Sequence, residues 1–164
     1  MMNLAGGCQC GAIRFLVTCA PTSTYICHCR MCQKAAGGPF GCFAIVPAAH
    51  FNWTRGSPTQ WASSSFGVRQ FCAACGTQVG YRYFDEREQY LTLGSFDDFQ
   101  ADIIAPTIQF GIESKVAWVD HLANLPSNDT EQSMSLEKLK NFINYQHPDH
   151  DTDAHWIPRP PEKD

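Results

Sequence analysis

Three features that would each define a class of protein are absent from the sequence. No apolar run approaches the ~20 residues that a membrane-spanning helix needs. Residues 1–7 lack the charged and apolar regions of a signal peptide. Lys and Arg are not clustered, because residues 1–126 carry eight basic and eight acidic side chains. We therefore expect a cytoplasmic protein with neither a membrane nor a nucleic acid as its partner.

Charged residues are also scarce, at 17% of 164 residues, whereas apolar residues make up 44%. This composition excludes a disordered chain, which would have many charges and few apolar residues. The net charge of −4 lies in residues 127–164, which carry eight acidic and four basic side chains. We therefore predict one domain over residues 1–126 and an acidic, proline-containing C-terminal extension over residues 127–164. The sequence does not indicate an oligomeric state.

Cysteine is abundant, with nine residues. An odd number cannot pair completely as disulfides, and paired spacings in a reducing compartment indicate metal binding. Two of the nine, Cys19 and Cys42, stand alone and are expected to be core residues. The other seven form three groups, which are Cys8/Cys10, Cys27/Cys29/Cys32 and Cys72/Cys75.

The two outer groups have the form of metal-binding turns. Each ends in a glycine, Gly11 or Gly76, which lets the chain turn its amides toward the sulfurs. In a compact β domain the two pairs can meet as a closed, tetrahedral zinc site. For Cys72 and Cys75 the alternative is a redox pair, which requires a helix at the motif, whereas a strand is expected here. We predict a structural zinc with the ligands Cys8, Cys10, Cys72 and Cys75.

The central group places three thiols within six residues. Thiolates of Cys27, Cys29 and Cys32 can converge on one zinc ion at about 2.3 Å. Two alternatives remain open: the three are buried residues that bind no metal, or an iron–sulfur cluster takes Cys19 or Cys42 as its fourth ligand. The neighbouring histidine at position 28 can ligate the ion or point away from it. We predict zinc here as well, and therefore two zinc ions per chain.

Short apolar and β-branched stretches, bounded by turn residues, predict a mainly β, antiparallel fold. Strands are expected at 12–18, 25–27, 40–46, 68–71, 78–83, 90–94, 107–110 and 116–119, a hairpin at 51–54 and 59–62, and one helical turn at 31–36. Ser135 can cap a short C-terminal helix at about 135–146, because apolar residues recur on one face of it. Residues 149–164 are expected to be extended and solvated.

The number of ligands predicts chemistry at the central group. Three cysteines with no evident fourth ligand describe an open zinc site, and open sites are where zinc acts in catalysis. Three thiolates give the zinc group a net charge of −1, which makes it a poor activator of water. It can instead hold a further thiol as thiolate. Such a thiolate is a nucleophile that adds to an electrophilic carbon, for example that of an aldehyde.

The cysteine groups and their neighbours resemble the glutathione-dependent formaldehyde-activating enzyme (Gfa) and centromere protein V family. The resemblance runs from about Gly6 to Val119. The matching segments are Gly7-Cys8-x-Cys10-Gly11, Cys27-His28-Cys29-x-x-Cys32-x-Lys34 and Phe71-Cys72-x-x-Cys75-Gly76-Thr77. Three spaced groups in the right order make the resemblance specific.

The resemblance implies an Mss4-like β fold, in which the outer cysteines hold a structural zinc and Cys27, Cys29 and Cys32 hold a catalytic zinc. It also implies the condensation of formaldehyde with glutathione to S-hydroxymethylglutathione, which is a carbon–sulfur lyase activity. Gln109 and Gly111 stand where many members have His and Trp. We therefore expect part of the pocket wall to differ from theirs.

One hypothesis and one alternative follow. The hypothesis is a zinc-dependent carbon–sulfur lyase that adds a thiol such as glutathione to a small aldehyde, or reverses that step. Arg30 and Lys34 would hold the carboxylates of the thiol, and Gly37 and Gly38 would allow close approach of the backbone. The alternative is a non-catalytic, zinc-stabilised binding module, in which His28 would complete the central site.

Overall fold

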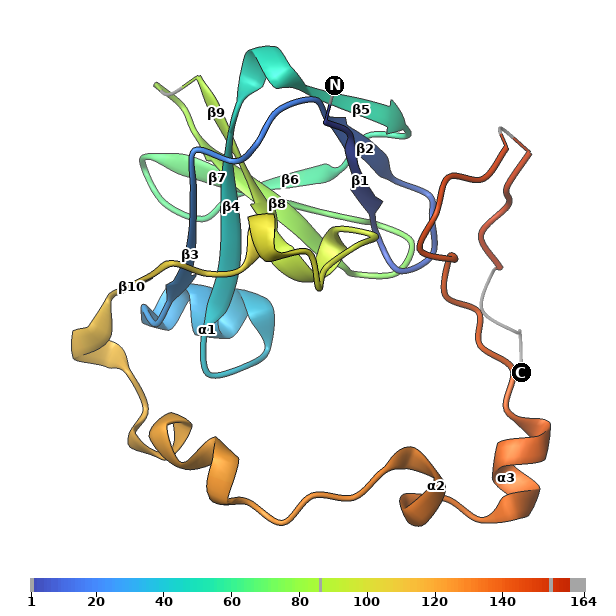
Figure 1. Ribbon diagram of the computed structural model, residues 1–164. Helices are drawn as coiled ribbons and strands as arrows, with labels where there is room; N and C mark the ends of the chain where they lie inside the picture. The colour runs from blue at the N-terminus through green and yellow to red at the C-terminus, as the bar shows by residue number, and fades with distance from the viewer. Residues whose placement is uncertain (1, 86, 154, 160–164) are drawn as a thin grey trace.

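Two β-sheets form the body of the protein in the computed structural model, which describes residues 2–85, 87–153 and 155–159 (Figure 1). The smaller sheet has the order β1-β2-β5, and the larger has the order β10-β3-β4-β9-β8-β7-β6. The strands are β1 (Leu4–Gly7), β2 (Arg14–Val17), β3 (Ser23–Cys27), β4 (Gly41–Pro47), β5 (Phe51–Arg55), β6 (Thr59–Ala62), β7 (Gly67–Phe71), β8 (Gln78–Tyr83), β9 (Glu88–Thr92) and β10 (Ile108–Phe110). Of the pairs between them, only β10 with β3 is parallel. The predicted mainly β, antiparallel fold is confirmed.

Strand β4 lies inside the larger sheet and is buried on both of its faces. Consecutive residues of a strand point to opposite faces, and Phe43 and Ala44 are 1% and 0% exposed. Ala44 and Val46 belong to the main core, which joins the two sheets and also contains Phe15 of β2. Phe43 packs on the other side, in a small cluster with Cys27 and two further cysteines. One strand therefore supports both the core and the central cysteine group.

The segment after β3 forms the short helix α1 (Arg30–Ala36). Cys29 caps its N-terminus, because the backbone N–H of Cys32 donates to its sulfur over 3.4 Å. Gly37 ends the helix in the left-handed region, at φ 66°, which glycine adopts without steric cost. The helical turn expected at 31–36 is confirmed; it contains Cys32, and Cys29 caps it.

Two expectations about local structure are wrong. Residues 51–54 and 59–62 do not form a hairpin, because β5 pairs with β2 whereas β6 pairs with β7 in the other sheet. Residues 116–119 do not form a strand, because Ala117–Asn124 is a run of 3₁₀-helix. Trp118 of that run is 53% exposed, so the apolar residues at 116–119 do not mark a strand that is buried against the sheets.

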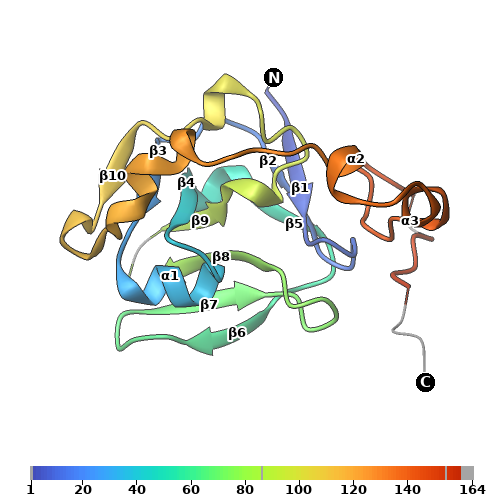
Figure 2. The ribbon, with the colours of Figure 1, turned by 90° about the horizontal axis from the view of Figure 1, so that it is seen from below.

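The C-terminal helix is shorter than the sequence predicts. It comprises α3 (Leu136–Asn141), preceded by the single turn α2 (Thr130–Ser133). Ser135 caps α3 as expected, by accepting a hydrogen bond from Lys138 N. Leu136, Phe142 and Ile143 of this segment are exposed, with Leu136 at 76%, whereas Leu139 is half-buried. The chain around α2 and α3 stands away from the sheets (Figures 1 and 2). Within the described residues, no helix is long and apolar enough to cross a membrane.

A buried ion pair ties the smaller sheet to the chain that follows β9. The guanidinium group of Arg14 donates to both carboxylate oxygens of Asp97, and one of these bonds is 2.6 Å long. The two side chains are 4% and 13% exposed. Asp97 holds the pKa of Arg14 above its usual value against the opposing effect of burial. Nη2 of Arg14 also donates to Asp151 Oδ1 over 3.1 Å, but that carboxylate is 78% exposed, so Asp97 is the buried partner of the charge.

Substitution of that carboxylate should destabilise the fold strongly. Asp97→Ala removes the buried partner and leaves the guanidinium group with the exposed Asp151 carboxylate, and we expect the free energy of unfolding to fall by about 3 kcal/mol, the lower end of the range for breaking a buried pair. The control is Asp120→Ala, which removes an exposed partner of Lys115 and should leave the free energy of unfolding almost unchanged. Urea titrations followed by circular dichroism measure both changes. Equal effects of the two substitutions would contradict the importance of the buried pair.

Candidate metal centres

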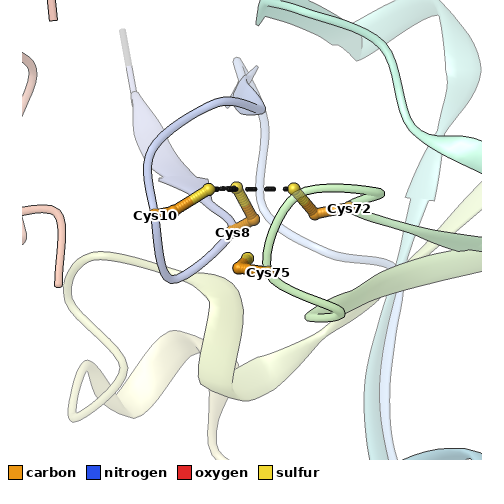
Figure 3. Close-up of side chains that lie close together, drawn as sticks. All are labelled: Cys8, Cys10, Cys72 and Cys75. Atoms are coloured by element: carbon orange, nitrogen blue, oxygen red, sulfur yellow. Dashed lines mark hydrogen bonds between the residues drawn. The ribbon is translucent and has the colours of Figure 1, made fainter. Parts of the chain in front are cut away.

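The four outer cysteines meet in space although more than 60 residues separate the pairs. Cys8 and Cys10 lie in the connection from β1 to β2, and Cys72 and Cys75 in the turn from β7 to β8 (Figure 3). All four sulfur atoms lie within 4.8 Å of one another. The distance from Cys10 Sγ is 3.6 Å to Cys8 Sγ and 3.8 Å to Cys72 Sγ. A tetrahedron with zinc–sulfur bonds of about 2.3 Å has edges of about 3.8 Å, so the sulfur positions fit a zinc ion.

Glycine and backbone hydrogen bonds give both turns their shape. Gly11 and Gly76 have φ values of 75° and 76°. The N–H of Gly11 donates to Cys8 O over 3.0 Å, and that of Gly76 to Cys72 O over 2.9 Å. The Thr77 hydroxyl joins the two turns, because it accepts from the backbone N–H of residue 9 and lies 3.2 Å from Cys75 Sγ. The backbone N–H of Ile13 donates to Cys8 Sγ over 3.3 Å, so the first turn does direct an amide toward a sulfur, as predicted.

The thiols of this cluster differ in acidity. Burial raises the pKa of Cys8 and Cys10. Burial also acts to raise the pKa of Cys75, but hydrogen bonds from the Thr77 side chain and from backbone N–H groups lower it to about 6. Several negative charges this close together need a cation to compensate them, and a divalent ion held by thiolates supplies it. The donor set thus fits zinc in its chemistry as well as in its geometry.

The C-terminal extension covers the turn that carries Cys8 and Cys10, which the sequence did not predict. The backbone N–H of His147 donates to Gln9 O over 2.7 Å, and Trp156 Nε1 donates to Cys10 O over 2.9 Å. Arg55 connects the two segments, since it donates both to Gly11 O and to backbone oxygens of the extension. The expectation that residues 149–164 are wholly solvated is therefore wrong for this described part. No periodic pattern in the sequence marks these contacts.

Removal of the Trp156 indole should increase the rate at which the outer cluster loses zinc. Trp156→Ala removes one hydrogen bond to Cys10 O, worth about 1 kcal/mol, and we expect zinc to pass to a chelator about fivefold faster. Trp61→Ala is the control, because Trp61 is 62% exposed on β6 and should leave the rate unchanged. A colorimetric zinc chelator measures the release. An unchanged rate for Trp156→Ala would contradict a protective role of the extension.

The central cysteines also converge. Cys27 ends β3, Cys29 caps α1 and Cys32 lies within it, and their sulfurs lie within 4.8 Å of one another. Burial raises the pKa of Cys27 and Cys32. For Cys29 burial acts in the same direction, but hydrogen bonds from the backbone N–H groups of Cys32 and Met31 lower its pKa. Arg69 Nη2 donates to Cys32 Sγ over 3.6 Å, which brings one cation to a cluster of three potential thiolates.

His28 turns away from the three sulfurs. Its ring is 1% exposed, and Nε2 donates to Gln109 Oε1 over 2.9 Å. Among the described residues, the groups of converging metal-ligating atoms include neither His28 nor Cys19 nor Cys42. This arrangement does not support His28 as a fourth zinc ligand, nor Cys19 or Cys42 as a ligand of an iron–sulfur cluster. Three protein ligands therefore meet at the central cluster of the described chain.

A cavity of about 400 Å³ opens beside the central sulfurs. Its lining consists of Tyr25, Cys27, Cys29, Met31, Cys32, Ile45, Ser63, Ser64, Gly67, Arg69, Tyr81, Tyr83, Tyr90, Ile108 and Phe110. Arg30, Lys34, Gly37 and Gly38 are not in this lining, and both cations are exposed on α1. That these four residues hold the substrate stays a prediction, and any such contact would lie outside the cavity. The cavity residues from β6 to β10 carried no signal in the sequence, because their types are ordinary for strands.

The two departures from the family pattern both lie at the central cluster. Gln109 is the partner of the buried His28 ring. Gly111 has φ 68°, and a Cβ atom there would lie 3.0 Å from Cys29 N. A tryptophan in this backbone conformation would press on a zinc ligand, so glycine suits the position.

The chain is similar in sequence to a known family and to two named proteins. Residues 3–114 match the family described as glutathione-dependent formaldehyde-activating enzyme. A protein of Halomonas elongata that is named as a glutathione-dependent formaldehyde-activating enzyme is 29% identical over 131 residues, which are 73% of this chain and 81% of that protein. An uncharacterized lyase of Schizosaccharomyces pombe is 32% identical over 92 residues, which are 55% of this chain. That match spans 65% of the lyase, slightly less than two thirds.

A solved structure shares the fold. The crystal structure of a Rhodobacter sphaeroides protein superimposes with a TM-score of 0.53 and covers 64% of this chain and 98% of that one, at 16% identity. At this identity the similarity concerns the fold alone. The family match covers more than half of the chain, so the protein belongs to the glutathione-dependent formaldehyde-activating enzyme family. The predicted resemblance is confirmed.

Single cysteine substitutions should separate the two clusters. We expect two zinc ions per purified chain, one in Cys29→Ser with the fold retained, and one or none in Cys72→Ser with a lower melting temperature. The control is Cys19→Ser, whose thiol lies in neither cluster, and it should keep both ions. Atomic emission spectrometry and circular dichroism give the readouts. Two ions in Cys29→Ser would contradict the central site.

Proposed function

We propose that this protein is a zinc-dependent carbon–sulfur lyase, which joins a thiol to a small aldehyde or cleaves the resulting adduct. The observation that carries the proposal is the set of three converging cysteine sulfurs at the wall of a cavity, with no fourth ligand among the described residues. Membership of the family supports it, as do the names of the two relatives, which refer to a lyase and to formaldehyde activation.

Zinc at the central cluster would supply a Lewis acid with one position open for a thiol, which it would keep deprotonated at neutral pH. Cys27, Cys29 and Cys32 would fix the position and the charge of that group. Arg69 donates to Cys32 Sγ and would offset part of the excess negative charge. His28 would orient the ligand turn, because its backbone N–H donates to Phe110 O over 2.9 Å and its ring to Gln109.

The reaction balances without an oxidant or a reductant. The thiolate sulfur gives an electron pair to the aldehyde carbon and forms the carbon–sulfur bond. The π pair of the carbonyl group moves to its oxygen, which takes the proton that the thiol released. One thiol and one aldehyde thus give one hydroxyalkyl thioether, and the reverse step breaks the same bond.

For the particular substrates we propose glutathione and formaldehyde, with S-hydroxymethylglutathione as the adduct. Arg30 and Lys34 are exposed on α1, near the ligands Cys29 and Cys32 in sequence, and would bind the carboxylates of the thiol. Gly37 and Gly38 follow at the end of α1 and would leave room for its backbone. A cytoplasmic location, where glutathione keeps thiols reduced, would suit this reaction.

Exchange spectroscopy tests the proposal. Zinc-loaded protein with glutathione and formaldehyde should accelerate exchange between free glutathione and the adduct, measured by NMR. Cys29→Ser should abolish at least 90% of the acceleration, because it removes a ligand of the central zinc, whereas Cys19→Ser should retain it. No acceleration by the wild-type protein would remove this substrate pair. Full activity of Cys29→Ser would remove the mechanism.

A further inference from the structure

The cavity beside the central cluster is large for the aldehyde proposed above. A cavity of about 150 Å³ with apolar walls holds a benzene molecule, and this one has about 400 Å³. Formaldehyde has two heavy atoms and resembles in size one or two water molecules, each with a share of about 30 Å³. A formaldehyde-derived group would therefore leave most of the cavity to water.

The walls of the cavity are suited to an apolar group. Four tyrosine rings line it, and Tyr81 stacks on Tyr90 with ring centroids 4.5 Å apart. Ile108 and Phe110 of β10 add apolar surface and are 59% and 65% exposed. Large exposed apolar side chains around a concave site are typical of ligand-binding surfaces. An aromatic ring would cover this surface and release the water from it.

Charged groups are rare in the same lining. Among the described residues of the lining, Arg69 is the only Lys, Arg, Asp or Glu, and it already donates to Cys32 Sγ. A thiol such as glutathione carries two carboxylates and an ammonium group, whose burial in this cavity would cost free energy without ionic partners. The exposed cations Arg30 and Lys34 on α1 lie outside the lining. The charged part of the thiol therefore has partners outside the cavity, which leaves the cavity to the other reactant.

Two tyrosine hydroxyl groups in the cavity can supply a hydrogen-bond donor for a carbonyl oxygen. Tyr25 and Tyr81 line the cavity and pack against the central cysteines, and their hydroxyl oxygens are 2.8 Å apart. A pair of hydroxyl groups has two protons and uses one in its mutual hydrogen bond. The second proton can be donated to an oxygen of the ligand. The cavity thus combines apolar walls with a hydrogen-bond donor.

We propose that the aldehydes of this enzyme extend beyond formaldehyde to those that carry an aromatic or similarly bulky apolar group, which occupies the cavity of four tyrosines while the thiol lies toward α1. This inference rests on the proposed carbon–sulfur lyase function and extends the range of its second substrate. The step is the one described above: the sulfur adds to the aldehyde carbon, and the carbonyl oxygen takes the thiol's proton. Only the substituent on the carbon changes.

Two aldehydes that differ by a phenyl group test the inference. Zinc-loaded protein is incubated with glutathione and either acetaldehyde or phenylacetaldehyde, and exchange with the adduct is measured by NMR relative to the uncatalysed rate. Burial of a phenyl ring should raise kcat/KM about 10- to 100-fold. Phe110→Ala should reduce this preference. Phe142→Ala is the matched control, because Phe142 is equally exposed at 65% but lies outside the cavity lining, and it should keep the preference.

Binding of an unreactive probe separates the inference from the proposed function. Benzyl alcohol should show saturation transfer from the zinc-loaded protein, with weaker transfer in Phe110→Ala and unchanged transfer in Phe142→Ala. Turnover of acetaldehyde or formaldehyde with no phenyl preference and no benzyl alcohol binding would overturn the inference and leave the function standing. No turnover of any aldehyde would overturn the function, and benzyl alcohol binding would then decide whether the cavity is an aromatic site.

A third arm tests the assignment of the apolar group to the aldehyde. Acetaldehyde is offered with benzyl mercaptan or with 2-mercaptoethanol. If the phenyl group increases kcat/KM only when the thiol carries it, the assignment to the aldehyde is overturned. If the phenyl group increases kcat/KM only when the aldehyde carries it, this supports the placement of the aldehyde in the cavity and of the thiol toward α1.

Discussion

The convergence of four sulfur atoms from two distant turns is the constraint on which the rest of the structure depends. Cys8 directly follows β1 of the smaller sheet and Cys72 directly follows β7 of the larger one, so a shared ion would hold the two sheets together. The hydrogen bond from Gln9 N to Thr77 and the ion pair of Arg14 with Asp97 act across the same junction. A polar contact and a buried charge pair thus restrain one interface, a metal ion held by the four cysteines would add to them, and the hydrophobic core between the sheets completes it.

The central cluster depends on this frame but is built differently. Its three ligands come from one short segment, the end of β3 and the start of α1, so local backbone geometry suffices to bring them together. Long-range contacts instead form its surroundings. Phe43 supports it from β4, and β10 supplies both Gln109 on the His28 ring and Phe110 at the cavity. The cluster is local in the sequence, whereas the pocket around it is assembled by the whole larger sheet.

This difference explains how much could be predicted from the sequence. Both cysteine sets were predicted, because thiol spacing is a local pattern that few other functions require. Strand β8 was predicted with its observed bounds, since its alternation is local too. The pairing of β5 and β6 in separate sheets was not, because two adjacent strands look like a hairpin unless their distant partners are known. The cavity residues and the contacts of Trp156 with Cys10 depend on such distant partners and leave no pattern in the chain.

Strand β10 has an alternation that separates two properties of the site. Ile108 and Phe110 face the cavity, whereas Gln109 between them pairs with the histidine of the ligand turn. Adjacent positions on one three-residue strand therefore have different constraints, one from the shape of the cavity and one from the hydrogen bond to the turn that carries the cysteines. With the proposed function, substitutions at 108 and 110 would alter which molecules fit without disturbing the chemistry of the thiolates. Specificity and reactivity would thus be adjustable separately on neighbouring residues.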